Sequence, residues 1–454
     1  MMGGVSAESE MPETGADGRE VGAAMAPRVL AGWARDALTA FSRRHDVSSS
    51  ELFLTASRGL TLEYEARTGG LTFNRGDSLS AAARVWQGER SGHAVLPVGA
   101  PEDLERVLSL ALVRMGPGSA APPVVAPGLD EDVPPPLPEL PAQRMQWLAE
   151  LLVHTVVPPG VVVQAVVLAR TVSWRVLVRG DGTLRFGSDS REEAFVRCET
   201  SRGAIVDAVA SPVAEDWAIT SLRERLAQAV EALEGPAEAV DPGLPLVLRP
   251  AVAAPLVAGL AWLLRGDVVA STPALSRAVG KKLFPSVLGV EDDPLHPLGA
   301  WRRGSDDEGV PTRRLRLVEE GRLQGFLHSA GTAARLGAEP NGRGLRFESS
   351  APVPSALNLF IVPRGDALPE RHTELVARVE MFTTMPRPGT VSLMAGGWEV
   401  HEGRRVRRIA PVELNLPVLE TFRGLRGVGS DLTFFPTAEG CGTPTLILPP
   451  LLGG

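Results

Sequence analysis

The chain has 454 residues, of which 44% are hydrophobic and 22% charged, so a folded protein of two or three domains is expected. The 46 Lys and Arg residues against 54 Asp and Glu residues give a net charge of −8, and without clustered cations this argues against nucleic-acid binding. Neither Cys198 nor Cys441 lies in a CxxC pair, which excludes a disulfide framework and a cysteine-rich metal site. The N-terminus lacks the apolar segment of a secretory signal, and the longest apolar stretch is too short to span a bilayer, so we expect a cytoplasmic protein.

The first elements predict an N-terminal α+β domain. Residues 1–27 are rich in Gly, Ala and Glu without hydrophobic periodicity, and are expected to form a disordered tail. Residues 28–115 begin with an amphipathic helix, continue with alternating segments over 51–57, 60–66 and 71–76, and end with a second helix after Pro101. The alternation indicates antiparallel strands, with turns expected at Arg58-Gly59 and Gly69-Gly70.

Three further segments follow. Residues 116–140 form the stretch richest in Pro and are expected to be an extended linker, because Pro lacks an amide donor and fixes φ. Residues 141–240 are predicted to form a middle segment of hairpins and helices. Residues 241–454 form the larger C-terminal unit, where a short buried strand leads directly into an apolar helix that ends at Gly266-Asp267. Overall the fold class is α+β with extensive antiparallel sheet.

Local spacing alone indicates no active site. None of the seven histidines lies three to five residues from another, so no helix face offers two imidazoles to a metal. Two acidic groups, Glu291–Asp293 followed by His296 and Asp306–Glu308, could bind a cation or a basic partner, but solvated turn loops explain them more simply. Cys441 could be a nucleophile, although its sequence neighbours include no general base, which favours a buried cysteine.

A longer series of motifs is more informative than any of these single residues. From residue 244 the chain runs through LPLVL, an apolar helix ending in RGD, VEDDP, SDDEGVPT, EEGRLQGFL, TAARLG, PNGRG and NLFIVPRG, and it closes with VGSDLTFFPT and CGTPTLILPP. In this order the motifs resemble the TldD/PmbA family, which includes the TldD-type and TldE-type subunits of a heterodimeric metalloprotease. The resemblance implies a two-domain fold, with an N-terminal domain of helices and antiparallel sheet and a larger C-terminal antiparallel-sheet domain that holds a buried helix.

The resemblance also predicts where a zinc site would lie. Catalytic members carry HExxxH directly before the Gly-Asp pair, and a cysteine near the C-terminus completes their site. Alignment on Gly266-Asp267 places Val257 at the first histidine, Ala258 at the glutamate and Trp262 at the second histidine. Val and Trp offer zinc no lone pair and Ala cannot act as a base, so no catalytic, metal or cofactor residue is assigned in this chain. The C-terminal region is shorter than in the catalytic subunit, and its Cys-Gly pair resembles the ending of the non-catalytic one.

These observations favour a TldE/PmbA-like, non-catalytic subunit. The resemblance implies a TldD-like partner that holds the zinc, unfolded or short peptides as substrates, roles in peptide degradation and leader-peptide removal, and an early link to modulation of DNA gyrase. Two alternatives stay open. One is an enzyme with a rebuilt site at Glu291–Asp293, Asp306–Glu308 and His296. The other is a stand-alone peptide-binding scaffold, which could form a homodimer.

Overall fold

The computed structural model describes residues 26–65, 67–117, 138, 141–153, 162–213, 217–347, 351–380, 384–387, 389–436 and 440–451, with 384–387 described by their backbone. Residues 1–25 of the expected disordered tail (1–27) lie outside the described residues. The last residue of that expected tail, Pro27, is already the first residue of the helix α1. Most of the expected linker over 116–140 also lies outside them. Among the described residues, no helix combines the length and the apolar content needed to cross a membrane.

The N-terminal half of the chain builds one large antiparallel sheet. Its strands lie in the order β4-β3-β2-β1-β5-β6-β7. Residues 28–115 and 141–240, treated separately in the sequence analysis, therefore contribute to the same sheet. The elements of this half are α1 (Pro27–Arg44), β1 (Ser49–Glu65), β2 (Gly70–Gln87), β3 (Arg90–Pro97), α2 (Glu102–Val113), β4 (Gly116–Pro117), α3 (Ala142–Leu151), β5 (Val162–Arg179), β6 (Leu184–Thr200), β7 (Gly203–Ser211) and α4 (Ile219–Leu233).

The strand β1 is longer than its sequence suggests. The turn predicted at Arg58-Gly59 is wrong, because both residues pair within the sheet: Gly59 lies opposite Gly76 of β2 and Thr171 of β5. Arg58 stays in the strand through an ion pair with Asp77, its direct neighbour on β2. The turn at Gly69-Gly70 is present, and Gly69 adopts the positive φ of 67° that the β1–β2 connection requires.

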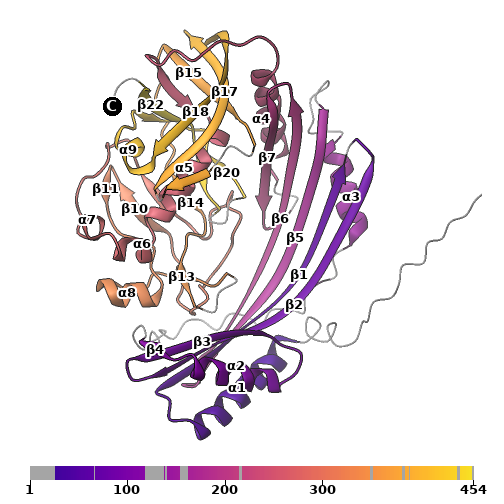
Figure 1. Cartoon of the computed structure of the whole chain (residues 1–454), viewed down its shortest axis with the longest axis vertical. Helices are drawn as coiled ribbons and strands as arrows, with labels where there is room; N and C mark the ends of the chain where they lie inside the picture. Colours follow the sequence, from indigo (N-terminus) through magenta and orange to yellow (C-terminus); the bar gives the residue numbers. More distant parts are fainter. Residues whose placement is uncertain are drawn as a thin grey trace, which may run out of the picture.

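Alternation along the strands separates the two faces of this sheet. Leu52 and Leu54 of β1 are fully buried in the cluster formed with α1 and α2. A second cluster packs α3 and α4 against the other end of the long strands, around Leu60 and Leu62 of β1. The alternate residues Glu51 and Phe53 point to the opposite face, where Phe53 lies under Arg346 of the C-terminal half. Figure 1 shows the long strands β1, β2, β5 and β6 curving past the C-terminal half.

The C-terminal half contains two larger sheets around one helix, and a two-stranded sheet of β12 and β13. One sheet has the order β16-β17-β15-β8-β22-β19, with β18 paired to β17, and the other has the order β11-β10-β9-β14-β21-β20. Its elements are β8 (Pro245–Leu248), α5 (Pro250–Leu263), α6 (Gly266–Ala270), α7 (Pro273–Ser276), β9 (Val290–Asp292), β10 (Leu315–Glu319), β11 (Arg322–Leu323), α8 (Ala330–Leu336), β12 (Gly344–Leu345), β13 (Val353–Pro354), β14 (Leu359–Ile361), β15 (Arg371–Arg378), β16 (Thr384–Arg387), β17 (Thr390–His401), β18 (Arg404–Pro417), α9 (Val418–Arg423), β19 (Gly427–Val428), β20 (Thr433–Phe434), β21 (Gly442–Thr443) and β22 (Leu446–Pro450).

The helix α5 lies at the centre of this half. Pro250 occupies its first turn, where a missing amide costs no hydrogen bond, and the helix is apolar on nearly every side. Val252, Leu256 and Leu260 are buried in one cluster with residues of both sheets. The expected α+β fold with a buried helix in the C-terminal domain is confirmed.

The two halves are also joined at the outer edge of the N-terminal sheet. Ile205 of β7 forms a bridge with Val379, and the Glu380 amide donates to the Ala204 carbonyl at 2.8 Å. Arg197 of β6 adds an ion pair with Glu380 at 3.0 Å. The β7 edge of the sheet is therefore covered by Val379 and Glu380, which directly follow β15.

Candidate functional site

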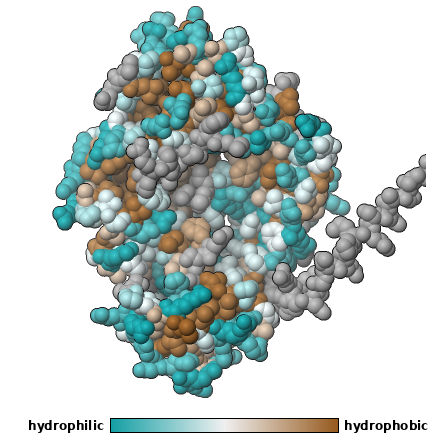
Figure 2. Space-filling model, in the orientation of Figure 1, coloured by the Kyte–Doolittle hydropathy of each residue, from teal (hydrophilic) through white to brown (hydrophobic). Residues whose placement is uncertain are grey.

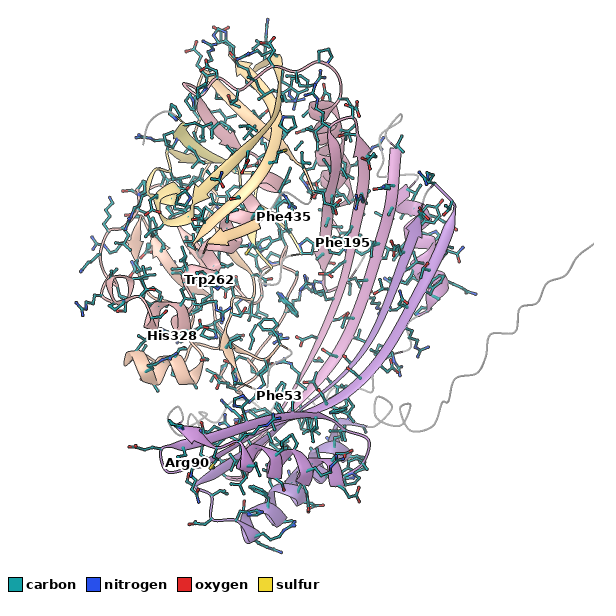
Figure 3. The ribbon with its side chains drawn as sticks, in the orientation of Figure 1. Phe53, Arg90, Phe195, Trp262, His328 and Phe435 are labelled. Atoms are coloured by element: carbon teal, nitrogen blue, oxygen red, sulfur yellow. The ribbon has the colours of Figure 1, made fainter. Side chains whose placement is uncertain are left out.

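The positions expected for the zinc motif lie on α5 but do not share one face. Ala251, Pro255, Ala258 and Trp262 form a partly exposed stripe, since they follow one another at intervals of four, three and four residues. Val257 points elsewhere and is completely buried in the core. Figure 3 shows Trp262 between His328 and Phe435 in this view. Its position on the stripe leaves Trp262 half-buried.

The Gly266-Asp267 pair that follows the helix has a structural role. A Cβ atom on Gly266 would lie 2.7 Å from Nδ1 of His328 and 2.9 Å from the Leu327 carbonyl, so only glycine permits this close approach. The Gly266 amide donates to the same carbonyl at 2.8 Å. Asp267 accepts from the Val268 amide at 3.0 Å and pairs with Arg265. Gly266 therefore connects α5 to the segment before α8, while Asp267 holds the start of α6.

Zinc does not fit the residues present at the motif positions. Val257 and Trp262 offer no donor atom, and Ala258 offers no carboxylate. Within the described ranges, Glu370, His401 and Glu402 are the one group of three or more His, Cys, Asp or Glu side chains whose ligand atoms lie within 4.8 Å of one another. All three are exposed and lie around the β17–β18 turn, not on α5.

A polar cavity of about 250 Å³ adjoins the N-terminus of α5. Arg225, Arg249 and Arg405 line it, together with Glu224 and Asp431. The arginines are already paired, for example Arg249 with Glu374 and Arg225 with Asp207. The cavity thus offers hydrogen-bonding groups of both signs next to the stripe of α5, which suits a polar backbone better than a simple anion.

The first acidic group is held by structural contacts. Asp292 and Arg343 are both fully buried and form an ion pair, and Asp292 also accepts from the amides of Leu357 and Asn358. Glu291 pairs with Arg314 on the adjoining segment. These partners occupy both carboxylates, which favours a role in holding β9 against its neighbours.

His296 does not join these carboxylates into one site. Its ring packs between Phe360 and Phe434, with centroid distances of 4.9 and 4.7 Å, and its Nδ1 accepts from the Leu298 amide. Burial lowers the pKa of His296, although the charge of Asp293 opposes this effect. The imidazole therefore stabilises a turn in its neutral form.

The second acidic group connects the two halves of the protein. Asp307 pairs with Arg175 of β5 at 2.6 Å and with Arg303, while Glu308 pairs with Arg84 of β2 at 3.3 Å and accepts from the Ala330 amide at 2.7 Å. Asp306 accepts backbone hydrogen bonds from within its own loop and from Gly344. Burial, with the nearby charge of Glu308, raises the pKa of Asp306 to about 7.

Sequence reasoning missed the residue at the centre of this network. Glu51 is fully buried and pairs with Arg84, Arg179 and Arg346. Burial would raise the pKa of Glu51, but the three arginines outweigh it and hold the pKa well below its usual range. We refer to Glu51, Asp307, Glu308 and these arginines with Arg175 as the ionic junction. A charged residue at a strand position that alternates with leucines was the available signal.

Cys441 is fully buried in the core cluster that surrounds α5. Its carbonyl accepts from the Phe435 amide at 3.0 Å. Cys198 is equally buried on β6, and burial raises the pKa of its thiol to about 12. The burial of Cys441 agrees with the interpretation of the sequence that favoured a buried cysteine at this position.

The fold, and the apolar helix that precedes a tightly packed Gly-Asp pair, define a protein of the TldD/PmbA architecture. Residues 243–451 match the family described as the PmbA/TldA metallopeptidase C-terminal domain. The C-terminal half of the chain therefore contains a domain of this family.

Solved structures match over nearly the whole chain. TldE from Thermococcus kodakarensis has a TM-score of 0.75 and 20% identity, and the match covers 92% of this chain and 98% of that one. A protein described as a candidate modulator of a DNA gyrase from Thermotoga maritima has a TM-score of 0.74 and 19% identity, covering 91% and 97%. At these identities the likeness shows the fold alone.

Curated relatives match over a shorter stretch. A metalloprotease from Methanothermobacter thermautotrophicus is 29% identical over 178 residues, which is 37% of each chain. The metalloprotease slr0863 from Synechocystis is 25% identical over 170 residues, which is 36% of each chain. The alignments thus span little more than a third of these relatives, and they support a metallopeptidase-related protein.

Proposed function

We propose that this chain is a TldE/PmbA-like, non-catalytic subunit that acts in the cytoplasm with a TldD-like subunit. The partner would supply the zinc and the catalytic base, and the two chains together would process unfolded or short peptides, including the removal of leader peptides. One observation carries the proposal: the zinc-motif position Val257 is fully buried in an apolar core, so the change affects the helix packing as well as the ligands.

The exposed part of α5 supports a role in peptide binding without chemistry. Its stripe of Ala251, Pro255, Ala258 and Trp262 offers apolar contacts, and the polar cavity at its N-terminus offers hydrogen-bond partners. Figure 2 shows hydrophobic and hydrophilic residues side by side over the surface of the C-terminal half. A peptide chain needs both kinds of contact, since its backbone is polar and many of its side chains are not.

The test is co-expression with a TldD-like paralogue that carries an intact HExxxH motif. We expect the two chains to co-purify at a defined ratio and to cleave an unstructured fluorogenic peptide, with activity lost when the motif glutamate of the paralogue becomes glutamine. A second test is the variant Trp262→Ala in this chain. Because Trp262 lies on the proposed peptide-binding stripe, this variant should raise KM for the peptide more than it lowers kcat. Zinc-dependent cleavage by this chain alone would refute the proposal.

A further inference from the structure

Another cavity, of about 180 Å³, lies at the C-terminal end of α5. It is bordered by α5, by α9 and by the segment that runs from α7 toward β11. Figure 1 shows α7 and α9 on the side of the C-terminal half that faces away from the large sheet. The cavity shares no lining residue with the polar cavity at the N-terminus of α5, so it is a separate site.

Two walls of this cavity are held in place independently of each other. On one side, the Gly280 amide donates to the Leu323 carbonyl at 2.8 Å and the Leu283 amide donates to the Gly321 carbonyl at 2.9 Å, which attaches this segment to the β10–β11 hairpin. On the other side, α9 packs on α5 through the fully buried Val418. Within the described ranges, no backbone hydrogen bond joins the two walls. The space between them is therefore not closed by the pairing that fixes each wall.

The lining of the cavity is apolar from the floor to the mouth. Leu260, Leu264 and Leu323 form the floor and are at most 2% exposed. Four further leucines of the lining pack against the same core cluster but are only partly buried: Leu263, Leu275, Leu283 and Leu419. An engineered cavity of about 150 Å³ lined by such residues stays dry and binds benzene. A cavity of this size and lining therefore accommodates about six carbon atoms.

One charged side chain borders this apolar space. Arg423 lies one turn after Leu419 on α9, so the two side chains share a face of the helix. The ion pair of Arg423 with Glu420 is exposed and long, at 3.8 Å, and such pairs contribute little. At the rim, the Thr272 hydroxyl already donates to the Val268 carbonyl at 3.0 Å. No acidic side chain is among the described lining residues. The cavity thus complements an apolar ligand with one negative charge.

We propose that this cavity binds a medium-chain fatty acid, with the alkyl chain among the leucines and the carboxylate at Arg423. Sites for drug-sized molecules are typically about 300–1,000 Å³, so a much larger ligand does not fit. The end of a peptide is a poorer match, because its backbone amides would need hydrogen-bond partners that the apolar lining does not offer.

A series of unbranched carboxylates tests the alkyl part of the site. Burial of each additional methylene group tightens binding about fourfold. The Kd, measured by ligand-observed NMR with the full chain, should therefore fall about fourfold from butanoate to pentanoate and again to hexanoate. It should stop falling in longer acids, because the cavity is then full. Hexylamine, with the same number of carbon atoms as hexanoate and the opposite charge, should bind more weakly.

Two kinds of variant separate the charge from the cavity. Arg423→Gln should weaken hexanoate binding by at least about tenfold and leave hexanol binding unchanged. The matched control Arg404→Gln, at an exposed residue where β18 begins, should change neither. Ala278→Leu fills the cavity from a buried position of its wall, and should abolish the binding of both ligands. If circular dichroism shows that this variant does not fold, Ala274→Trp blocks the cavity from its exposed rim.

Four outcomes would overturn the proposal. They are the absence of hexanoate binding at millimolar concentration, binding that survives the filling or blocking variant, equal affinity for hexanoate and hexylamine, and tighter binding of N-acetyl-leucine than of hexanoate. The last outcome would assign the cavity to the C-terminus of a peptide. These measurements use this chain alone and no peptide cleavage, so they stand or fall separately from the proposed function.

Discussion

Restoring the zinc motif tests how far this chain has diverged from a catalytic one. The triple variant Val257→His, Ala258→Glu and Trp262→His provides the side chains of the motif. We expect it to be destabilised and inactive, because residues 257 and 262 are five positions apart, about 140° from eclipsed on a regular helix. In the structure, α5 continues without interruption from Pro250 to Leu263, so Val257 faces the core while Trp262 lies on the partly exposed stripe.

The size of the effect follows from the burial of each residue. Val257 is 0% exposed, so an imidazole there costs about 1–3 kcal/mol for overpacking and about 1–3 kcal/mol for burial of a polar group. Trp262 is half-buried, and its replacement should therefore cost less than the roughly 3–5 kcal/mol of a fully buried Trp. We expect the free energy of unfolding to fall by about 3–7 kcal/mol in total.

Urea unfolding, zinc content and peptide cleavage together measure the outcome. The single variant Ala258→Glu is the control, since a carboxylate on the exposed stripe should cost under about 1 kcal/mol. A triple variant with one tightly bound zinc, unchanged stability and zinc-dependent cleavage would refute the reasoning.

Three further outcomes are expected. Asp292→Ala should lower the free energy of unfolding by about 3–5 kcal/mol, because it leaves the fully buried Arg343 without its carboxylate, and the added change Arg343→Met should recover most of the loss in urea titrations. An equal loss in both variants would contradict the role of that ion pair. Because the pKa of Glu51 is lowered in the folded protein, the contribution of Glu51 to the free energy of unfolding is complete above its unfolded pKa of about 4.3 and decreases as the pH falls further. Glu51→Gln should therefore flatten the acid side of a curve of stability against pH. An unchanged acid side would argue against the ionic junction. Burial of Cys198 should keep its thiol unreactive toward iodoacetamide at pH 8 until urea unfolds the chain, and rapid labelling of the native protein at this residue would show that the strand opens.

Features encoded by neighbouring residues could be predicted from the sequence, and those encoded by distant pairs could not. The apolar helix α5 and the Gly266-Asp267 pair were predictable because a continuous apolar run and a fixed motif mark them locally. The break predicted at Arg58-Gly59 was wrong because Gly59 is a strand residue here, held by neighbours on both sides. Composition at one position cannot reveal such pairing.

The ionic junction shows the same limit at longer range. Glu51 and Arg346 are 295 positions apart, and nothing in either local sequence links them. The acidic group Asp306–Glu308 was visible in the sequence, but its arginine partners on β2 and β5 were not. As a result the sequence left open whether these carboxylates bind a cation, and the structure surrounds them with arginines and backbone amides.

The curved sheet is fastened to the C-terminal half at two separate places, by the ionic junction near one end of its long strands and by the bridge from β7 to Val379 near the other. A sheet that is attached at both ends cannot rotate about a hinge at either one. Its remaining freedom is bending of the unsupported span between the supports, where the displacement is small and opposed by every ladder of hydrogen bonds that crosses it. The distance between the sheet and the C-terminal half is therefore fixed at both ends when the protein folds.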